Sequence, residues 1–177
     1  PALGRLAPVR KAIGRRTIFN LLGPMANPAG VTRQLIGVAR VDYLPTVAAA
    51  LDLLGTHSAM IVSGEESLDE ISIAGPSRAI RLGACGTGEE RIGPEDAGLE
   101  RHGLESIRGG DPAFNAAALR RLLAGEAGPY RDAVLLNSAA ALIVADKAPG
   151  WREGAAKAAE AIDAGLARDL LDRWITL

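Results

Sequence analysis

The sequence predicts an α/β fold in which a mostly parallel β-sheet is flanked by helices. The first observation is a strand pattern at Gln34 to Val38, a helical pattern at Tyr43 to Leu54 and a second strand pattern at Ser58 to Ser63. A strand, a helix and a strand joined by short links are typical of a βαβ unit, whose strands run parallel. The second observation is that the last third of the chain carries mainly helical patterns. The length of 177 residues fits one domain.

The composition indicates an aliphatic core. Hydrophobic residues make up 48% of the chain but aromatic residues only 3%, so Leu, Ile, Val and Ala must fill the core. The net charge of −1 argues against a nucleic-acid binder and against a protein that binds anionic membranes. The one cysteine, Cys85, excludes an internal disulfide and fits a reducing cytoplasm. We interpret Cys85 as structural or incidental.

No segment predicts export or a membrane crossing. The first residues lack the apolar region of a secretory signal. The longest uncharged apolar run with a helical pattern, Ala133 to Ala145, has 13 residues, fewer than the roughly 20 that a bilayer requires. We therefore expect a cytoplasmic protein.

The first 28 residues combine a basic cluster with a proline-containing turn. Leu3 to Arg16 carries five Arg or Lys residues, which form either a solvated helix face or an anion site where an Arg grips a carboxylate or phosphate. Thr17 to Leu22 predicts a short buried helix that ends at Gly23 and Pro24, because proline cannot donate to the helix. The rigid turn suits a ligand-facing wall and an ordinary connection equally.

The stretch from Ala59 to Ile73 reads as a strand, an acidic loop and a second short strand. Gly64 can adopt a positive φ where the chain leaves the first strand, at the sheet edge where α/β proteins bind ligands. Four carboxylates follow within six residues, and they repel each other unless solvent, an Arg patch or a divalent ion neutralises them. A magnesium ion held by one or two carboxylates and a substrate phosphate is one such arrangement. These carboxylates belong to Glu65, Glu66, Asp69 and Glu70.

The middle of the chain predicts little regular structure. Ser77 to Leu82 alternates as a half-buried edge strand, whereas Gly83 to Gly110 is rich in glycine and turns. Gly86-Thr87-Gly88 is not interpreted as a phosphate loop, because no long apolar strand precedes it. We interpret His57 and His102 as surface residues, since neither has a carboxylate or a histidine at helical spacing.

The last third predicts four helices. Asp111 and Pro112 open the first helix, as an N-cap residue and as the first helical residue. The second helix is apolar almost all round, which predicts that it is buried. Asn137 and Ser138 in its middle then need hydrogen-bond partners, such as a backbone at a helix crossing. The last two helices are amphipathic and are expected on the surface. The helical patterns cover residues 111–124, 129–146, 150–164 and 167–174.

Ordered motifs resemble those of the anthranilate phosphoribosyltransferase family. Pro8-Val9-Arg10 and the run from Arg16 to Pro28 resemble the central signature of the family, and Leu68-Asp69-Glu70-Ile71-Ser72 resembles its magnesium motif. The resemblance covers nearly all 177 residues. Further motifs match in order and approximate spacing at Gly110-Asp111-Pro112, Arg131 to Leu142 and Ala161 to Gly165.

The resemblance implies the carboxy-terminal portion of the nucleoside phosphorylase/phosphoribosyltransferase large domain. It implies transfer of the phosphoribosyl group from phosphoribosyl pyrophosphate to anthranilate, in tryptophan biosynthesis. By the same resemblance, Arg10 pairs with the anthranilate carboxylate and Pro24 lies at the wall of the anthranilate channel. Asp69 and Glu70 match the acidic pair that holds Mg²⁺ on the diphosphate. No catalytic residue is assigned, because a neutral aromatic amine needs no strong base.

Three positions depart from the family pattern. Ala26 stands where the family usually has Thr, and Ser63 lies near a usual His. Ser67 replaces a usual Gly, which could change the path of the acidic loop.

Three family features are not in the sequence. The Gly-Thr-Gly-Gly-Asp phosphate loop, the Lys-His-Gly-Asn segment and most of the small helical domain, which usually forms the homodimer, lie earlier in the family's chains. We therefore expect residues 1–177 to be the carboxy-terminal part of the α/β domain. Two alternatives stay open. One is a related enzyme acting on a nucleoside or another aromatic acid, against which Arg10 argues. The other is an inactive fragment that binds only a metal or a partner chain.

Overall fold

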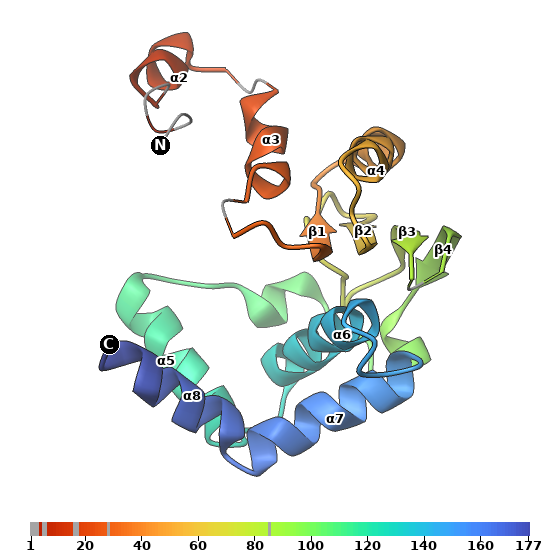
Figure 1. The fold of residues 1–177 in the computed structure, drawn as a ribbon. Helices are drawn as coiled ribbons and strands as arrows, with labels where there is room; N and C mark the ends of the chain where they lie inside the picture. The colour runs from red at the N-terminus through yellow and green to blue at the C-terminus, as the bar shows by residue number, and fades with distance from the viewer. Residues whose placement is uncertain (1–3, 5–6, 16–17, 28, 85) are drawn as a thin grey trace. The chain divides into compact units, whose positions relative to one another are not determined.

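The computed structural model describes residue 4 and residues 7–15, 18–27, 29–84 and 86–177. The chain divides into two compact units, Pro1–Val31 and Thr32–Leu177. The first unit contains the short helices α2 (Ala7–Ile13) and α3 (Phe19–Met25). The second unit contains a β-sheet and the remaining helices (Figure 1).

Helix α3 does not end where the sequence predicted. It continues through Gly23 and Pro24 to Met25, so the expected turn at these two residues is wrong. Pro24 removes one backbone hydrogen bond, but the helix closes beyond it. The Ala26 amide donates to the carbonyls of Leu22 and Gly23 at 3.0 and 3.2 Å.

The sheet is mixed, and the prediction of a mostly parallel sheet is wrong. Its four strands lie side by side in the order in which they occur in the chain. The first two strands run parallel, with Arg33 opposite Ser58, whereas the other two neighbouring pairs are antiparallel. The strands are β1 (Arg33–Gly37), β2 (Ser58–Gly64), β3 (Ser77–Gly83) and β4 (Gly88–Ile92).

The connections explain this pattern. β1 leads into β2 through the 3₁₀ turn η1 (Val41–Tyr43) and helix α4 (Leu44–Leu53), which confirms the βαβ unit. Gly55, with φ of +74°, follows the end of α4 as predicted. In the part of the chain that the structure describes, no helix separates β2 from β3 or β3 from β4, and neighbouring strands joined without a crossover run antiparallel.

Two strand assignments were also wrong. The edge strand is β4 and not β3, because Gly88–Ile92 pairs with β3 within the stretch that was expected to be rich in turns. Its residues are mostly charged, which suits an edge strand but hides the strand pattern. The run Ile71 to Ile73 forms no strand, although both isoleucine side chains are fully buried.

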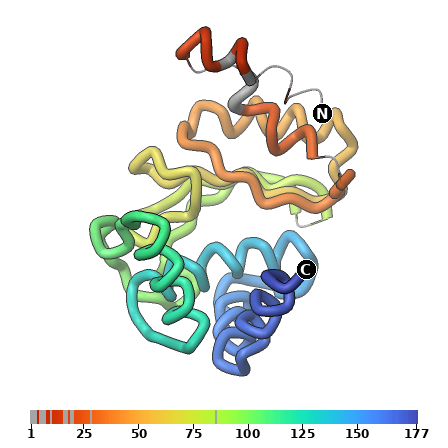
Figure 2. Tube along the Cα trace, turned by 90° about the vertical axis from the view of Figure 1, so that its left-hand side faces the viewer, coloured from red at the N-terminus to blue at the C-terminus, as the bar shows by residue number. Residues whose placement is uncertain are grey.

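The two faces of the sheet carry different helices (Figures 1 and 2). Helix α4 covers one face, and α6 (Pro129–Val144) lies against the other. Because side chains alternate along a strand, Met60 and Val62 of the fully buried β2 join the core beneath α6. This core includes Leu136 and Ala140 of α6.

The carboxy-terminal helices follow the predicted order. The buried helix of the prediction is α6, against which α7 (Trp151–Asp163) packs. None of the helices in the described ranges combines the length and apolarity that a membrane crossing requires. The remaining elements are the 3₁₀ turns η2 (Pro94–Ala97) and η3 (Leu104–Ile107) and helices α5 (Pro112–Leu123) and α8 (Leu166–Ile175).

The N-cap of α5 offers a test of the fold. The Asp111 carboxylate accepts a hydrogen bond from the Phe114 amide at 2.8 Å, as the sequence predicted. Asp111→Ala should lower the free energy of unfolding by about 1 kcal/mol, because a helix amide loses its partner. Asp111→Asn keeps the acceptor and should lose less than half as much. Urea unfolding of both variants measures this, and equal losses would contradict the capping role.

Candidate functional site

The acidic loop borders a cavity of about 520 Å³ at the carboxyl ends of the parallel strands β1 and β2. Asp69 and Glu70, the two residues predicted to hold a metal, both line it and both are exposed. The structure therefore places this pair in a hollow at the predicted edge of the sheet. The cavity is lined by Leu35, Gly37, Val62, Asp69, Glu70, Tyr130, Ala133, Val134, Asn137, Ser138 and Ala141.

The acidic loop leaves β2 through a tight turn. The Gly64 amide donates to the Leu68 carbonyl at 2.9 Å, and the Ser67 amide donates to the Gly64 carbonyl at 3.0 Å. Gly64 does not adopt the positive φ that it was expected to use. It is instead needed for space, because a Cβ there would lie 3.0 Å from the Leu68 Cβ and 3.2 Å from the Ser72 Cβ.

Ser67 adopts the left-handed conformation, with φ of 64°. This is the position where the resembling family usually has glycine. The left-handed conformation costs a residue with a Cβ roughly 1–2 kcal/mol. The serine therefore tolerates this strain at the turn, and the loop still delivers Asp69 and Glu70 to the cavity.

The backbone after the acidic pair is held from several sides. The Asn137 carboxamide of α6 accepts from the Ile71 amide at 3.0 Å and donates to the Ile71 carbonyl at 2.9 Å. The Ser72 amide donates to the Ser77 hydroxyl at 2.8 Å, and the His102 amide donates to the Ile73 carbonyl at 2.9 Å. Side chains and a loop amide thus form the hydrogen bonds that a neighbouring strand would otherwise make with this segment.

Gly37, at the end of β1, provides the space for Asp69. A Cβ on Gly37 would overlap the Asp69 carbonyl oxygen, so only glycine allows this approach. Sequence reasoning missed Gly37. The available signal was a glycine inside a predicted strand, which often marks a close approach by another backbone.

The acids of the loop differ in their partners. Glu65 forms an ion pair with Arg91 at 3.0 Å, so one carboxylate is neutralised by the protein. Asp69 and Glu70 have no ion pair or side-chain hydrogen bond with any residue that the structure describes. Within the described ranges, no three His, Cys, Asp or Glu side chains converge to enclose a metal ion. The pair therefore suits an ion that takes its other ligands from a bound molecule.

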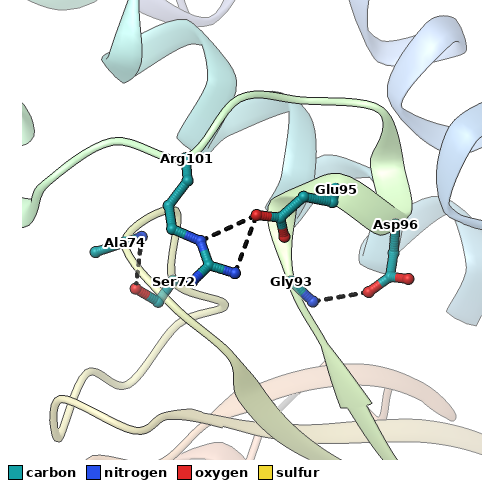
Figure 3. A network of polar contacts seen from close by, with 6 residues as sticks. All are labelled: Ser72, Ala74, Gly93, Glu95, Asp96 and Arg101. Atoms are coloured by element: carbon teal, nitrogen blue, oxygen red, sulfur yellow. Dashed lines mark hydrogen bonds and ion pairs between the residues drawn. The ribbon is translucent and has the colours of Figure 1, made fainter.

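A second polar network supports the turn beside this segment (Figure 3). The Arg101 guanidinium bonds the Glu95 carboxylate at 3.0 Å, and this bond holds the pKa of Glu95 below its usual value. Asp96 accepts from the Gly93 amide at 2.8 Å, and the Ser72 hydroxyl accepts from the Ala74 amide at 3.0 Å. These contacts order the residues that precede His102.

His102 is not a simple surface residue, contrary to the prediction. Its Nε2 lies 2.9 Å from an Asp132 carboxylate oxygen, and both side chains are about three-quarters buried, with 22% and 23% exposed. The partners are 30 residues apart, so helical spacing could not reveal the contact. His57 is exposed as predicted.

The predicted substrate residues belong to the other compact unit. The Arg10 backbone lies in α2, but its side chain lies outside what the structure describes. Pro24 is exposed within α3. Cys85 also lies outside the described residues. The structure therefore places Asp69 and Glu70 at one cavity, and the metal role of this pair and the substrate roles of Arg10 and Pro24 stay predictions.

Comparison with known proteins identifies the family. Residues 1–168 match the family described as "Glycosyl transferase family, a/b domain". The chain belongs to this family. It is 55% identical to the anthranilate phosphoribosyltransferase of Novosphingobium aromaticivorans, over 99% of this chain and 53% of that protein. It is 58% identical to that of Sphingopyxis alaskensis, over 99% of this chain and 53% of that protein. The resemblance inferred from the motifs is confirmed.

Solved structures agree with this family assignment. The anthranilate phosphoribosyltransferase of Thermus thermophilus superimposes with a TM-score of 0.91 and 42% identity, over 99% of this chain and 52% of that one. That of Saccharomyces cerevisiae, in complex with PRPP and Mg, gives 0.88 and 29%, over 98% of this chain and 50% of that one. The chain spans about half the length of the relatives it matches.

Gly37→Ala tests the close approach at the site. We expect it to lower the free energy of unfolding by about 1–3 kcal/mol, because the new methyl group displaces the Asp69 backbone. Backbone amide signals of residues 68–71 should shift in NMR spectra. Gly103→Ala is the control, since Gly103 has φ of −67° and a methyl group there would meet no atom within 4 Å. Similar stability and unshifted amide signals in both variants would contradict the close packing of the Asp69 backbone on Gly37.

Proposed function

We propose that this chain forms the metal-binding part of an anthranilate phosphoribosyltransferase. The reaction transfers the phosphoribosyl group of phosphoribosyl pyrophosphate to the amine of anthranilate, giving N-(5-phosphoribosyl)anthranilate and pyrophosphate, in tryptophan biosynthesis. The observation that carries the proposal is the Asp69–Glu70 pair. It faces a cavity without a counterion among the described residues, in a chain 55% identical to an anthranilate phosphoribosyltransferase.

The residues present fit a magnesium ion. Mg²⁺ prefers hard oxygen ligands and is usually bound by one or two carboxylates together with substrate phosphates. Asp69 and Glu70 would supply these carboxylates from the cavity wall, and the diphosphate would supply further oxygens. When bound, Mg²⁺ would stabilise the negative charge that develops on the departing pyrophosphate. The related yeast protein in complex with PRPP and Mg supports this interpretation.

Arg10 and Pro24 would serve the second substrate. A guanidinium pairs with a carboxylate through two parallel hydrogen bonds, so Arg10 would fix the ring of anthranilate by its carboxylate. Fixing the ring holds the neighbouring amine close to the ribose carbon that it attacks. Pro24 would form part of the wall along which anthranilate enters. The neutral amine needs no strong base, so no described residue is assigned that role.

The second candidate function is binding without turnover. Residues 1–177 span about half of each relative, so this part could bind the metal and its diphosphate while the reaction requires segments outside it. An assay of the chain alone separates the two functions. Turnover by the chain alone would exclude the binding-only function, and binding without turnover would favour it.

Replacing the acidic pair tests the metal site. In the chain fused behind the amino-terminal half of the Sphingopyxis alaskensis relative, Asp69→Asn with Glu70→Gln should lower kcat about 100-fold or more, because charge on the leaving group is no longer stabilised. The dependence of kcat on the Mg²⁺ concentration should also weaken in this variant.

The matched control is Glu65→Gln with Glu66→Gln, which makes the same charge change in the same loop. It should keep the Mg²⁺ response, since neither residue lines the cavity. An unchanged metal response in the Asp69 and Glu70 variant would exclude this site.

Replacing Arg10 tests the anthranilate site in the same fusion protein. Arg10→Ala should raise the KM for anthranilate by about tenfold or more, because a charge-assisted bond is worth roughly 1.5–3 kcal/mol. The KM for phosphoribosyl pyrophosphate should change little. Lys11→Ala, a neighbour in the same basic cluster, is the control and should change neither value. Equal increases for both substrates in Arg10→Ala would refute the assignment.

A further inference from the structure

Asn137 occupies an unusual position in α6. Its neighbours Leu136, Ala139 and Ala140 in the same helix are buried, whereas Asn137 itself is half-buried. Asparagine is a poorer helix former than alanine or leucine, so helix formation does not explain it. Its side chain lines the same cavity as Asp69 and Glu70.

The Asn137 carboxamide uses both of its ends on one backbone residue. Its oxygen accepts from the Ile71 amide at 3.0 Å, and its nitrogen donates to the Ile71 carbonyl at 2.9 Å. The same nitrogen donates to the Ala133 carbonyl one helical turn earlier, at 3.0 Å. The carboxamide is therefore fixed to its own helix and pairs with Ile71 as a neighbouring strand would.

This pairing sits directly beside the acidic pair. Ile71 follows Glu70, and its side chain is 1% exposed, so the residue is anchored by both its backbone and its side chain. On the other flank, the Asp69 carbonyl packs against Gly37 at the end of β1. Asp69 and Glu70 are thus held between a strand end and a buried helix, while their carboxylates stay exposed to the cavity.

We propose that Asn137 is a positioning residue for the reaction: it holds the backbone of residues 69–71 so that both carboxylates meet one ion. The proposal rests on the proposed function for the identity of that ion. Partners that orient metal ligands typically contribute 10–100-fold to metal affinity. A carboxamide that only satisfied a buried backbone would affect stability and leave the metal affinity unchanged.

The first test needs no metal. Amide hydrogen exchange is compared in the unsubstituted chain, Asn137→Leu and Asn137→Ala. Leucine keeps the size of the side chain and alanine avoids any clash, so agreement between them assigns the effect to the carboxamide. We expect exchange at Ile71 and its neighbours to accelerate at least tenfold in both. Ile162→Ala in α7 is the control for a general loss of stability and should show no such local effect.

The second test uses Mn²⁺ as the probe, with pyrophosphate present. Paramagnetic broadening of the amides of residues 68–71 reports binding at the acidic pair. We expect the Mn²⁺ concentration at half-effect to rise about tenfold or more in Asn137→Leu and Asn137→Ala. Ile162→Ala should match the unsubstituted chain, and Asn137→Gln, which retains the amide group, should recover part of the affinity.

The outcomes distinguish the proposed metal site from the proposed positioning role of Asn137. Unchanged exchange at Ile71, or a Mn²⁺ affinity within twofold of the unsubstituted chain, would overturn the role of Asn137. Absence of broadening at residues 68–71 in the unsubstituted chain would overturn the metal site itself, and with it the positioning role. Accelerated exchange together with weakened Mn²⁺ binding supports both.

Discussion

The acidic segment depends on the pairing between the Asn137 carboxamide and the Ile71 backbone. Among the described residues, no strand pairs with Ile71, so its amide and carbonyl would otherwise be unpaired next to the core. Leaving a buried donor or acceptor unpaired costs roughly 1–3 kcal/mol, which makes the pairing a strong constraint on the loop. Because α6 is packed into the core, Asp69 and Glu70 are placed by a buried helix, although they are themselves exposed.

The four acids of the loop differ in whether the protein supplies them with a partner. Arg91 neutralises Glu65, and the Glu66 carboxylate lies over Gly75, where a Cβ would come within 2.8 Å of it. Asp69 and Glu70 are adjacent like charges, which disfavour each other unless a cation approaches. An ion brought in with a diphosphate would relieve this repulsion. The loop therefore pairs Glu65 with Arg91 of β4 and leaves Asp69 and Glu70 without an ion-pair partner among the described residues.

The sequence predicted the features that depend on local pattern. The βαβ unit, the N-cap at Asp111 and the buried α6 follow from periodicity and end signals, and the structure confirms them. The placement of Asp69 and Glu70 at the carboxyl edge of a parallel pair of strands could be predicted because motif and topology agreed. The antiparallel half of the sheet could not be predicted, because the charged sequence of β4 is typical of a loop.

Contacts between residues that are far apart in the sequence explain the remaining differences between the predictions and the structure. Gly37 matters only because the Asp69 backbone packs on it, and the His102–Asp132 contact joins residues that are 30 positions apart. The need of Asn137 for a partner could be predicted, but the identity of that partner could not. The left-handed conformation at Ser67 shows that a loop can keep its path without the usual glycine.

The central claim is that Asp69 and Glu70 form one metal site with a diphosphate. The most direct measurement is anomalous diffraction from crystals of the chain grown with Mn²⁺ and pyrophosphate. We predict a manganese peak in the cavity between α6 and the ends of β1 and β2, coordinated directly or through water by both carboxylates. Bound pyrophosphate with manganese elsewhere, or with no manganese at these carboxylates, would contradict it.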